Sequence, residues 1–137
     1  MNKFNISSIL VACGLVLSVS AVAQNISKEE HEAAEKAIVA EFKSDKAQCE
    51  SLLHNAKDIC VAEAKGKEKV AKAELEAKFK PSKEATYKVS VAKAEANYDV
   101  AKEKCDDIKG NDHEVCEKEA KAALEKAKSD AKANQHH

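Results

Sequence analysis

The sequence predicts an all-α fold made of two duplicated helical hairpins, each stapled by a disulfide bond. The first observation is composition: Ala, Lys and Glu dominate the 137 residues, which include only 3 Gly and 1 Pro, as in long helices. The second is a repeated pattern of paired cysteines, CESLLHNAKDIC from Cys49 to Cys60 and CDDIKGNDHEVC from Cys105 to Cys116. The third is a stripe of apolar residues at helical spacing between the two pairs.

The first 23 residues have the features of a secretory signal peptide. Lys3 supplies the positive charge, an apolar run extends over residues 9–19, and Ala21-Val22-Ala23 offers a cleavage site. We therefore expect a mature chain that starts at Gln24 and is exported to the periplasm. The residues before Cys13 also resemble a lipoprotein cleavage box, but the apolar run continues past them to a better site. We expect neither lipidation nor any membrane insertion of the mature chain.

Residues 24–137 are predicted to form a single all-helical domain of two repeats, about 27–80 and 83–133. The repeats are offset by about 56 residues, and Glu-Ala-Lys follows the second cysteine of each pair at the same distance. Such regular self-similarity indicates a duplicated structural unit. Pro81, the only proline, separates the repeats, because a helix usually ends before such a residue.

Each repeat is predicted to contain a helix, a turn and a second helix. In the second repeat Gly110 suits the left-handed position after a helix end, and Asn111 with Glu114 three residues later is typical of an N-cap. In the first repeat His54 takes the place of Gly110, and Asn55 is the predicted N-cap. These signals predict four helices, at about 27–53, 56–79, 83–109 and 112–133.

A stripe of apolar residues, here named the seam, runs along the third predicted helix at alternating steps of four and three residues. Its large members are Tyr87, Val91 and Tyr98, and Phe42 corresponds to Tyr98 in the first repeat. Such a stripe buries one face of a helix against a neighbour. Because the chain is poor in Leu, Ile, Val and Phe, we expect self-association to bury the seam residues better than one copy can.

Two disulfide connectivities correspond to two architectures. If both turns form, the bridges are Cys49–Cys60 and Cys105–Cys116, and each staples one hairpin near its tip. If two long antiparallel helices turn at Pro81, the bridges are Cys49–Cys116 and Cys60–Cys105, an arrangement that resembles the twin-cysteine hairpins of small oxidised mitochondrial proteins. We favour four helices, because a Gly inside a helix costs about 1 kcal/mol and a good N-cap would have no role.

The charge balance and the motifs exclude several function classes. The net charge is −1 and the 23 basic side chains include no Arg, so we expect no nucleic-acid partner. The four paired cysteines lack Cys-x-x-Cys or zinc-finger spacing, the His residues before the C-terminus are isolated, and no phosphate-binding or catalytic motif occurs. We therefore expect a protein without enzymatic activity and without a metal or other cofactor.

Two segments of the chain resemble a known family. They read KDICVAEAKGKEKVAKAELEAKFKPS and YKVSVAKAEANYDVAKEKCDDIKGNDHEVCEKEAKAAL, and they are similar to small exported proteobacterial proteins that are rich in Ala, Lys and Glu. The resemblance covers about residues 40–133, and its specific part is the cysteine-flanked turn followed by Glu-Ala-Lys. Members are sometimes labelled as similar to the helical middle domain of the envelope protein TolA. The family has no characterised function and implies no catalytic or binding residues.

Three functions follow as hypotheses. The first is a periplasmic structural or interaction protein that acts through its seam surfaces, with another protein or a second copy of itself as partner. The second is a redox-sensitive or metal-binding protein that uses Cys49, Cys60, Cys105 and Cys116 as thiols. The third is a holdase-like envelope stress protein, which needs exposed apolar surface.

Overall fold

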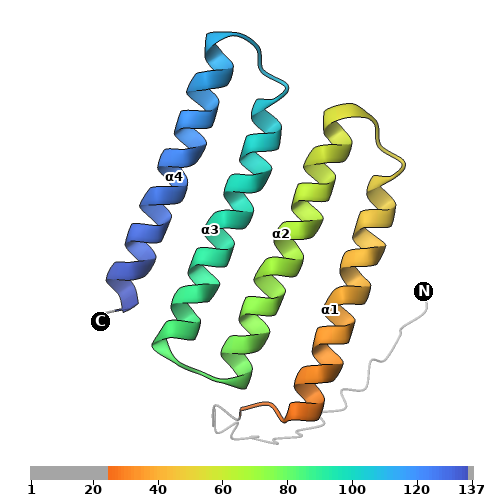
Figure 1. The fold of residues 1–137 in the computed structure, drawn as a ribbon, viewed down its shortest axis with the longest axis vertical. Coiled ribbons are helices and arrows are strands. Elements are labelled where there is room, and N and C mark those ends of the chain that lie inside the picture. Colours follow the sequence, from red (N-terminus) through yellow and green to blue (C-terminus); the bar gives the residue numbers. More distant parts are fainter. Residues whose placement is uncertain (1–24, 136–137) are drawn as a thin grey trace, which may run out of the picture.

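A computed structural model describes residues 25–135 of the chain, and these residues form four α-helices. The all-α prediction is confirmed. The helices are α1 (Lys28–Cys49), α2 (His54–Phe79), α3 (Lys83–Cys105) and α4 (Asn111–Gln135), and successive helices run in opposite directions (Figure 1). The predicted signal peptide, its cleavage site and Cys13 lie outside the described residues.

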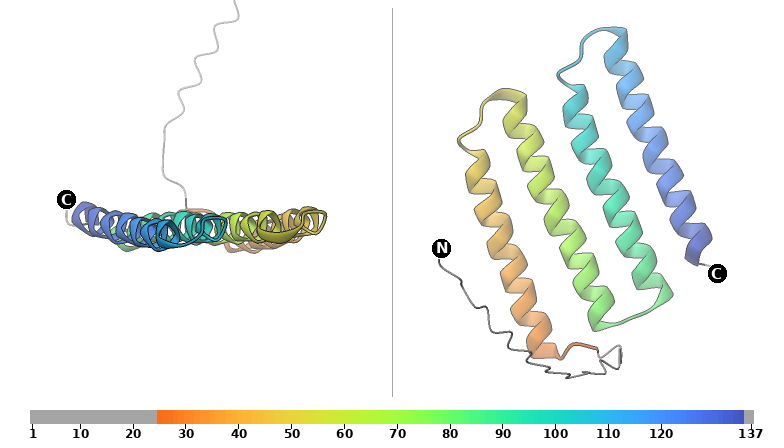
Figure 2. Two further views of the ribbon diagram at one scale, coloured as in Figure 1. Left: turned by 90° about the horizontal axis from the view of Figure 1, so that it is seen from above. Right: turned by 180° about the vertical axis from the view of Figure 1, so that it is seen from behind.

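The four helices lie side by side in a single layer. Seen along the helices they form one row (Figure 2), and each helix contacts only its neighbours in the sequence: α1 with α2, α2 with α3, and α3 with α4. A bundle would fold the row onto itself and bury a central core. Here no element among residues 25–135 covers either broad face of the layer.

The helix interfaces are built from small side chains. Leu75 is the only buried residue larger than Cys among those described, and the other buried side chains are almost all Ala. Helices α2 and α3 approach closely at Gly66, where a Cβ atom would lie 2.9 Å from the Cβ of Ala96. Small residues let the helix axes approach closely but bury little apolar area. The stability gained from burial is therefore modest.

Both disulfide bonds lie within hairpins. Cys49 is bonded to Cys60 and Cys105 to Cys116, with Cα atoms 5.6 and 5.7 Å apart. The two bonds are at the same end of the layer, and the loop at Pro81 is at the other end (Figure 1). This is the four-helix alternative, and the pairing expected for two long helices does not occur. The origin of the two hairpins by duplication stays a prediction.

Helices α1 and α3 end about four residues earlier than the sequence predicts. They stop at Cys49 and Cys105, because residues 50–53 and 106–110 are needed to reverse the chain and bring the bonded cysteines together. His54 and Gly110 have φ angles of 53° and 69°, the left-handed conformation predicted for both positions. Asn111, the N-cap in the sequence prediction, is instead the first residue within α4.

The prediction that Asn55 caps α2 is wrong. The helix begins at His54, and the flanking Leu53 makes no side-chain cap hydrogen bond. The Asn55 Nδ2 atom instead donates a hydrogen bond of 2.7 Å to the backbone oxygen of Glu103, near the end of α3. The Asn55 side chain thus bonds to a residue distant in the sequence rather than to the start of its own helix. This hydrogen bond ties the tips of the two hairpins together.

Candidate functional site

Helices α1, α2 and α3 form an open groove of about 930 Å³ on one face of the layer. Its floor consists of six half-buried apolar residues, two from each helix. They are Ile38, Phe42, Val70, Ala71, Val100 and Ala101. The groove exists because α1 and α3 flank α2 without touching each other, so their side chains border the surface of α2 from both sides. Helix α4 contributes no residue to it.

The two walls of the groove carry opposite charge. The charged residues that α1 contributes are Glu41 and Asp45, here named the acidic wall, whereas α3 contributes Lys93 and Lys104, here named the basic wall. Helix α2, between them, contributes both acids and a lysine. The groove therefore has an apolar floor and a charge gradient from one side to the other. A partner that fits it needs an apolar surface to cover the floor and charges in the reverse order.

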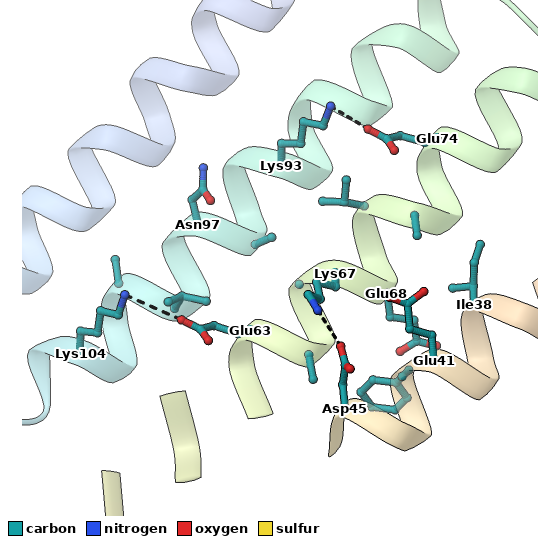
Figure 3. A pocket seen from close by; sticks show the side chains of 18 residues that line it. Ile38, Glu41, Asp45, Glu63, Lys67, Glu68, Glu74, Lys93, Asn97 and Lys104 are labelled. Atoms are coloured by element: carbon teal, nitrogen blue, oxygen red, sulfur yellow. Dashed lines mark hydrogen bonds and ion pairs between the residues drawn. The ribbon is translucent and has the colours of Figure 1, made fainter. Parts of the chain in front are cut away.

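Ion pairs connect the charged residues of the groove across the helix interfaces (Figure 3). The Lys67 Nζ atom lies 2.9 Å from Asp45 Oδ2, which joins α2 to α1, and this carboxylate raises the pKa of the Lys67 ammonium. Lys93 lies 2.7 Å from Glu74 and Lys104 lies 3.9 Å from Glu63, which joins α3 to α2. Within residues 25–135 Glu41 has no ion-pair partner.

A separate charge network joins α2, α3 and α4 away from the groove. The Lys69 Nζ atom lies 3.5 Å from Glu95 and 3.3 Å from Asp99, and Lys128 Nζ lies 3.0 Å from Glu95. Hydrogen bonding to Lys128 is the main cause of the lowered pKa of Glu95. Glu95 is two residues from Lys93, and residues two apart on a helix point in nearly opposite directions. This charge network therefore lies on the side of the layer opposite the groove.

The seam residues lie in two different places. Phe42 lines the groove. Tyr87, Val91 and Tyr98 do not, although each is half-buried. They share a stripe of three- and four-residue steps with Cys105, which is bonded to Cys116 of α4, so these three residues face toward α4. Ala101, on the same stripe, lines the groove.

The sequence interpretation missed Val70 and Val100. Each stands among Ala and charged residues, and no large apolar residue lies three, four or seven positions away on its own helix. A helical pattern is read along one helix, whereas this floor is assembled from three. The only signal that could have identified them is their rarity, because few large aliphatic residues occur in the chain.

The remaining reactive side chains are engaged elsewhere or scattered. All four paired cysteines are in disulfide bonds, so none of them offers a thiol in this state. The His31 Nε2 atom lies 2.6 Å from Glu76 Oε1, and the His113 Nε2 atom lies 3.3 Å from Asp106 Oδ1. In the part of the chain that the structure describes, no three His, Cys, Asp or Glu side chains are placed to hold a metal ion.

The open groove, with its apolar floor and charged walls, suits binding to the surface of another molecule. Among the described helices, none has both the length and the apolar character needed to cross a membrane. Comparison of the chain with protein-family models, with curated proteins and with solved structures gives no match. The function is therefore argued from the geometry of the groove.

Proposed function

We propose that this protein is a non-enzymatic, helical interaction module of the periplasm that binds a protein surface through its groove. The observation that carries the proposal is the half-buried apolar floor between an acidic and a basic wall. In a single layer of helices, side chains such as Phe42 and Val100 can be buried fully only by a second surface. Burying a large apolar side chain stabilises by about 1.5–3 kcal/mol, so such a floor favours association.

The two disulfide bonds support the periplasmic location in this proposal. Two disulfide bonds are consistent with an oxidising, exported location, because reducing conditions in the cytosol disfavour such bonds. The pattern of residues 1–23 adds the expected route of export. Because the apolar core is small, the packing within each hairpin is weak, and each disulfide bond stabilises the hairpin that it closes.

A direct test uses a photo-crosslinking amino acid in cells. It replaces Val70 on the groove floor or, as the matched control, Val61 on the same helix, which is also half-buried but does not line the groove. We expect covalent adducts of defined mass from position 70 and none from position 61. Equal labelling at the two positions, or no adduct from position 70, would contradict a function based on the groove.

A holdase-like role is the second candidate, and one specific observation favours it. The described residues with large exposed apolar side chains gather at the two hairpin tips, at the same end of the layer (Figure 1). They are Leu52, Leu53, Ile108 and Val115, and Leu53 is 73% exposed. Suppression of the heat-induced aggregation of a client enzyme would test this role. We expect a Leu53→Asp, Ile108→Asp variant to lose the effect while a Val70→Glu variant keeps it.

A further inference from the structure

We propose that the occupant of the groove is a second copy of this chain, in a symmetric dimer whose two-fold axis runs along α2. The inference rests on the proposed function and names its partner. In this dimer the two layers stack groove to groove. Helix α2 of one copy faces α2 of the other, and α1 of each copy lies over α3 of its partner.

The full face of α1, α2 and α3, of which the groove takes up about half the length, has the size that a stable dimer needs. Helix α1 has 22 residues, so at a rise of about 1.5 Å per residue the face is about 33 Å long. Three helices with axes about 9 Å apart make it about 27 Å wide. The resulting footprint of about 900 Å² per copy compares with about 800 Å² per partner in a typical specific interface.

The charges of the walls select one orientation of the dimer. Two equal faces can be stacked by a two-fold axis that runs across the helices or along them. An axis across the helices places each acidic wall over the partner's acidic wall and each basic wall over the partner's basic wall. Helix α2 faces its own copy with either axis, and its groove charges are already paired within the chain, with Asp45, Lys72, Lys93 and Lys104. An axis along α2 places the acidic wall over the basic wall twice. Opposed like charges cost affinity, whereas opposite charges fix the register.

The helices also bring the two walls to a common level. Cys49 lies beside Cys60, with the Cα atoms 5.6 Å apart. Six residues further along α2, Gly66 faces Ala96 on α3, and six residues back along α1 from Cys49 is Lys43. Because antiparallel helices share the rise of about 1.5 Å per residue, residue 43 and residue 96 lie at about the same level.

Glu41 and Lys93 therefore meet in this dimer. Glu41 precedes Lys43 by two residues on α1, and Lys93 precedes Ala96 by three residues on α3, so both lie further from the disulfide end of the layer. Their heights along the helix axis differ by about 1.5 Å. Glu41 makes no ion pair within residues 25–135. Lys93 contacts Glu74 at 2.7 Å, yet its side chain is 54% exposed and an ammonium has three donors. Each dimer would contain this pair twice.

The first experiment measures mass by sedimentation of the oxidised protein from micromolar to millimolar concentration. We expect a dimer, and we expect Val70→Glu and Val100→Glu to give monomers. The matched controls are Val61→Glu and Val91→Glu, which place the same charge on the same helices at half-buried positions outside the groove; we expect both to dimerise. A wild-type monomer at every concentration, or control variants that dissociate as readily as the groove variants, would overturn the proposal.

The second experiment exchanges charges at exposed positions, so it does not depend on a variant that tolerates a buried charge. Glu41→Lys and Lys93→Glu each place like charges opposite one another twice, and we expect at least about a tenfold loss of dimer affinity for each alone. In a mixture, one variant carries lysine at both positions and the other carries glutamate at both. Every contact between positions 41 and 93 then joins opposite charges, so we expect a heterodimer close to the wild-type affinity. Circular dichroism checks that each variant is helical.

The outcomes separate this inference from the proposed function. A mixture that associates no better than the single variants would overturn the axis along α2. A monomeric protein that still gives adducts of another mass at position 70 in cells would overturn the second copy as occupant and leave the groove as an interaction surface. A monomer without adducts at position 70 would contradict both.

Discussion

At the residue scale, the contact between Gly66 and Ala96 limits how the two hairpins pack. The atom that a new Cβ would meet at 2.9 Å is itself a Cβ, which cannot move without its helix. A Gly to Ala change in a helix gains about 1 kcal/mol of propensity, whereas overpacking costs about 1–3 kcal/mol. We expect Gly66→Ala to lower the free energy of unfolding by about 1 kcal/mol, measured by urea denaturation.

A double-mutant cycle isolates this contact. With Ala96→Gly in place the clash is removed, so Gly66→Ala should then raise the free energy of unfolding by about 1 kcal/mol through propensity alone. A change of sign between the two backgrounds is the expected result. The same effect of Gly66→Ala in both would mean that α2 and α3 separate freely at this point.

Glu95 gives the fold a defined response to acid. Its bond to Lys128 lowers its pKa in the folded state, so its stabilisation is present above the ordinary carboxyl pKa of about 4.3 and is lost as pH falls through the lower, folded value. Glu95→Gln should remove this part of the acid sensitivity. Because the side chain is 36% exposed, we expect the loss of Tm between pH 6 and pH 3 to shrink by only about 2–4 °C.

Thermal unfolding followed by circular dichroism at both pH values provides the measurement. The matched control is Glu119→Gln, an exposed carboxylate on α4 for which no ion pair is found within residues 25–135, and it should leave the slope with pH unchanged. An equal reduction of the slope in both variants would assign the acid sensitivity to net charge rather than to the pair of Glu95 and Lys128.

At the element scale, each hairpin depends on its disulfide bond. Closing a loop of about a dozen residues is worth about 3 kcal/mol, a large share of the stability of a small domain. We expect Cys49→Ala with Cys60→Ala to lower the free energy of unfolding by about this amount, measured in urea. Alanine is chosen because Cys49 is fully buried, where a serine hydroxyl would add a cost of its own.

The other bond serves as its comparison. Cys105→Ala with Cys116→Ala should cost a similar free energy, but α4 does not line the groove, so dimerisation should weaken only in the variant that lacks the bond between α1 and α2. Stability unchanged by either pair of substitutions would contradict the role of the bonds as staples.

The elements could be predicted where the signal was local. Gly110 lies between residues that favour a turn, and the paired cysteines flank it, so the hairpin followed from a few neighbouring residues. The role of Asn55 could not be predicted in this way, because its partner Glu103 is 48 residues away. The early end of α1 was missed because residues 50–53 have no Gly or Pro, and it is set by the disulfide bond.

At the scale of the whole molecule, the single layer did not follow from the sequence. Stripes of Ala on several faces of each helix allow more than one neighbour at similar cost, and the pattern contains no strong apolar face that would fold the row into a bundle. Close contacts such as the one between Gly66 and Ala96 decide the neighbours, and these depend on three-dimensional fit. The groove is a consequence of the layer, so it could not be predicted either.

The layer predicts an order of local stability. Helices α2 and α3 each contact two neighbours, whereas α1 and α4 each contact one, as in a linear array of repeats. We expect backbone amides of α2 and α3 to exchange hydrogen more slowly than those of α1 and α4 in dilute protein, measured by mass spectrometry of peptic fragments. Equal protection of all four helices would show that the layer unfolds as one cooperative unit.

Raising the protein concentration should make the rate of hydrogen exchange in α1 differ from that in α4. In the proposed dimer α1 covers α3 of the partner, whereas α4 lies outside the groove and gains no neighbour. Raising the concentration through the dimerisation range should therefore slow exchange in α1 and leave α4 unchanged. Val70→Glu should abolish this difference, because it removes the dimer but not the contacts within one chain. If α4 became protected as strongly as α1, the partner would be covering the side of the layer opposite the groove, and the groove would not be the subunit interface.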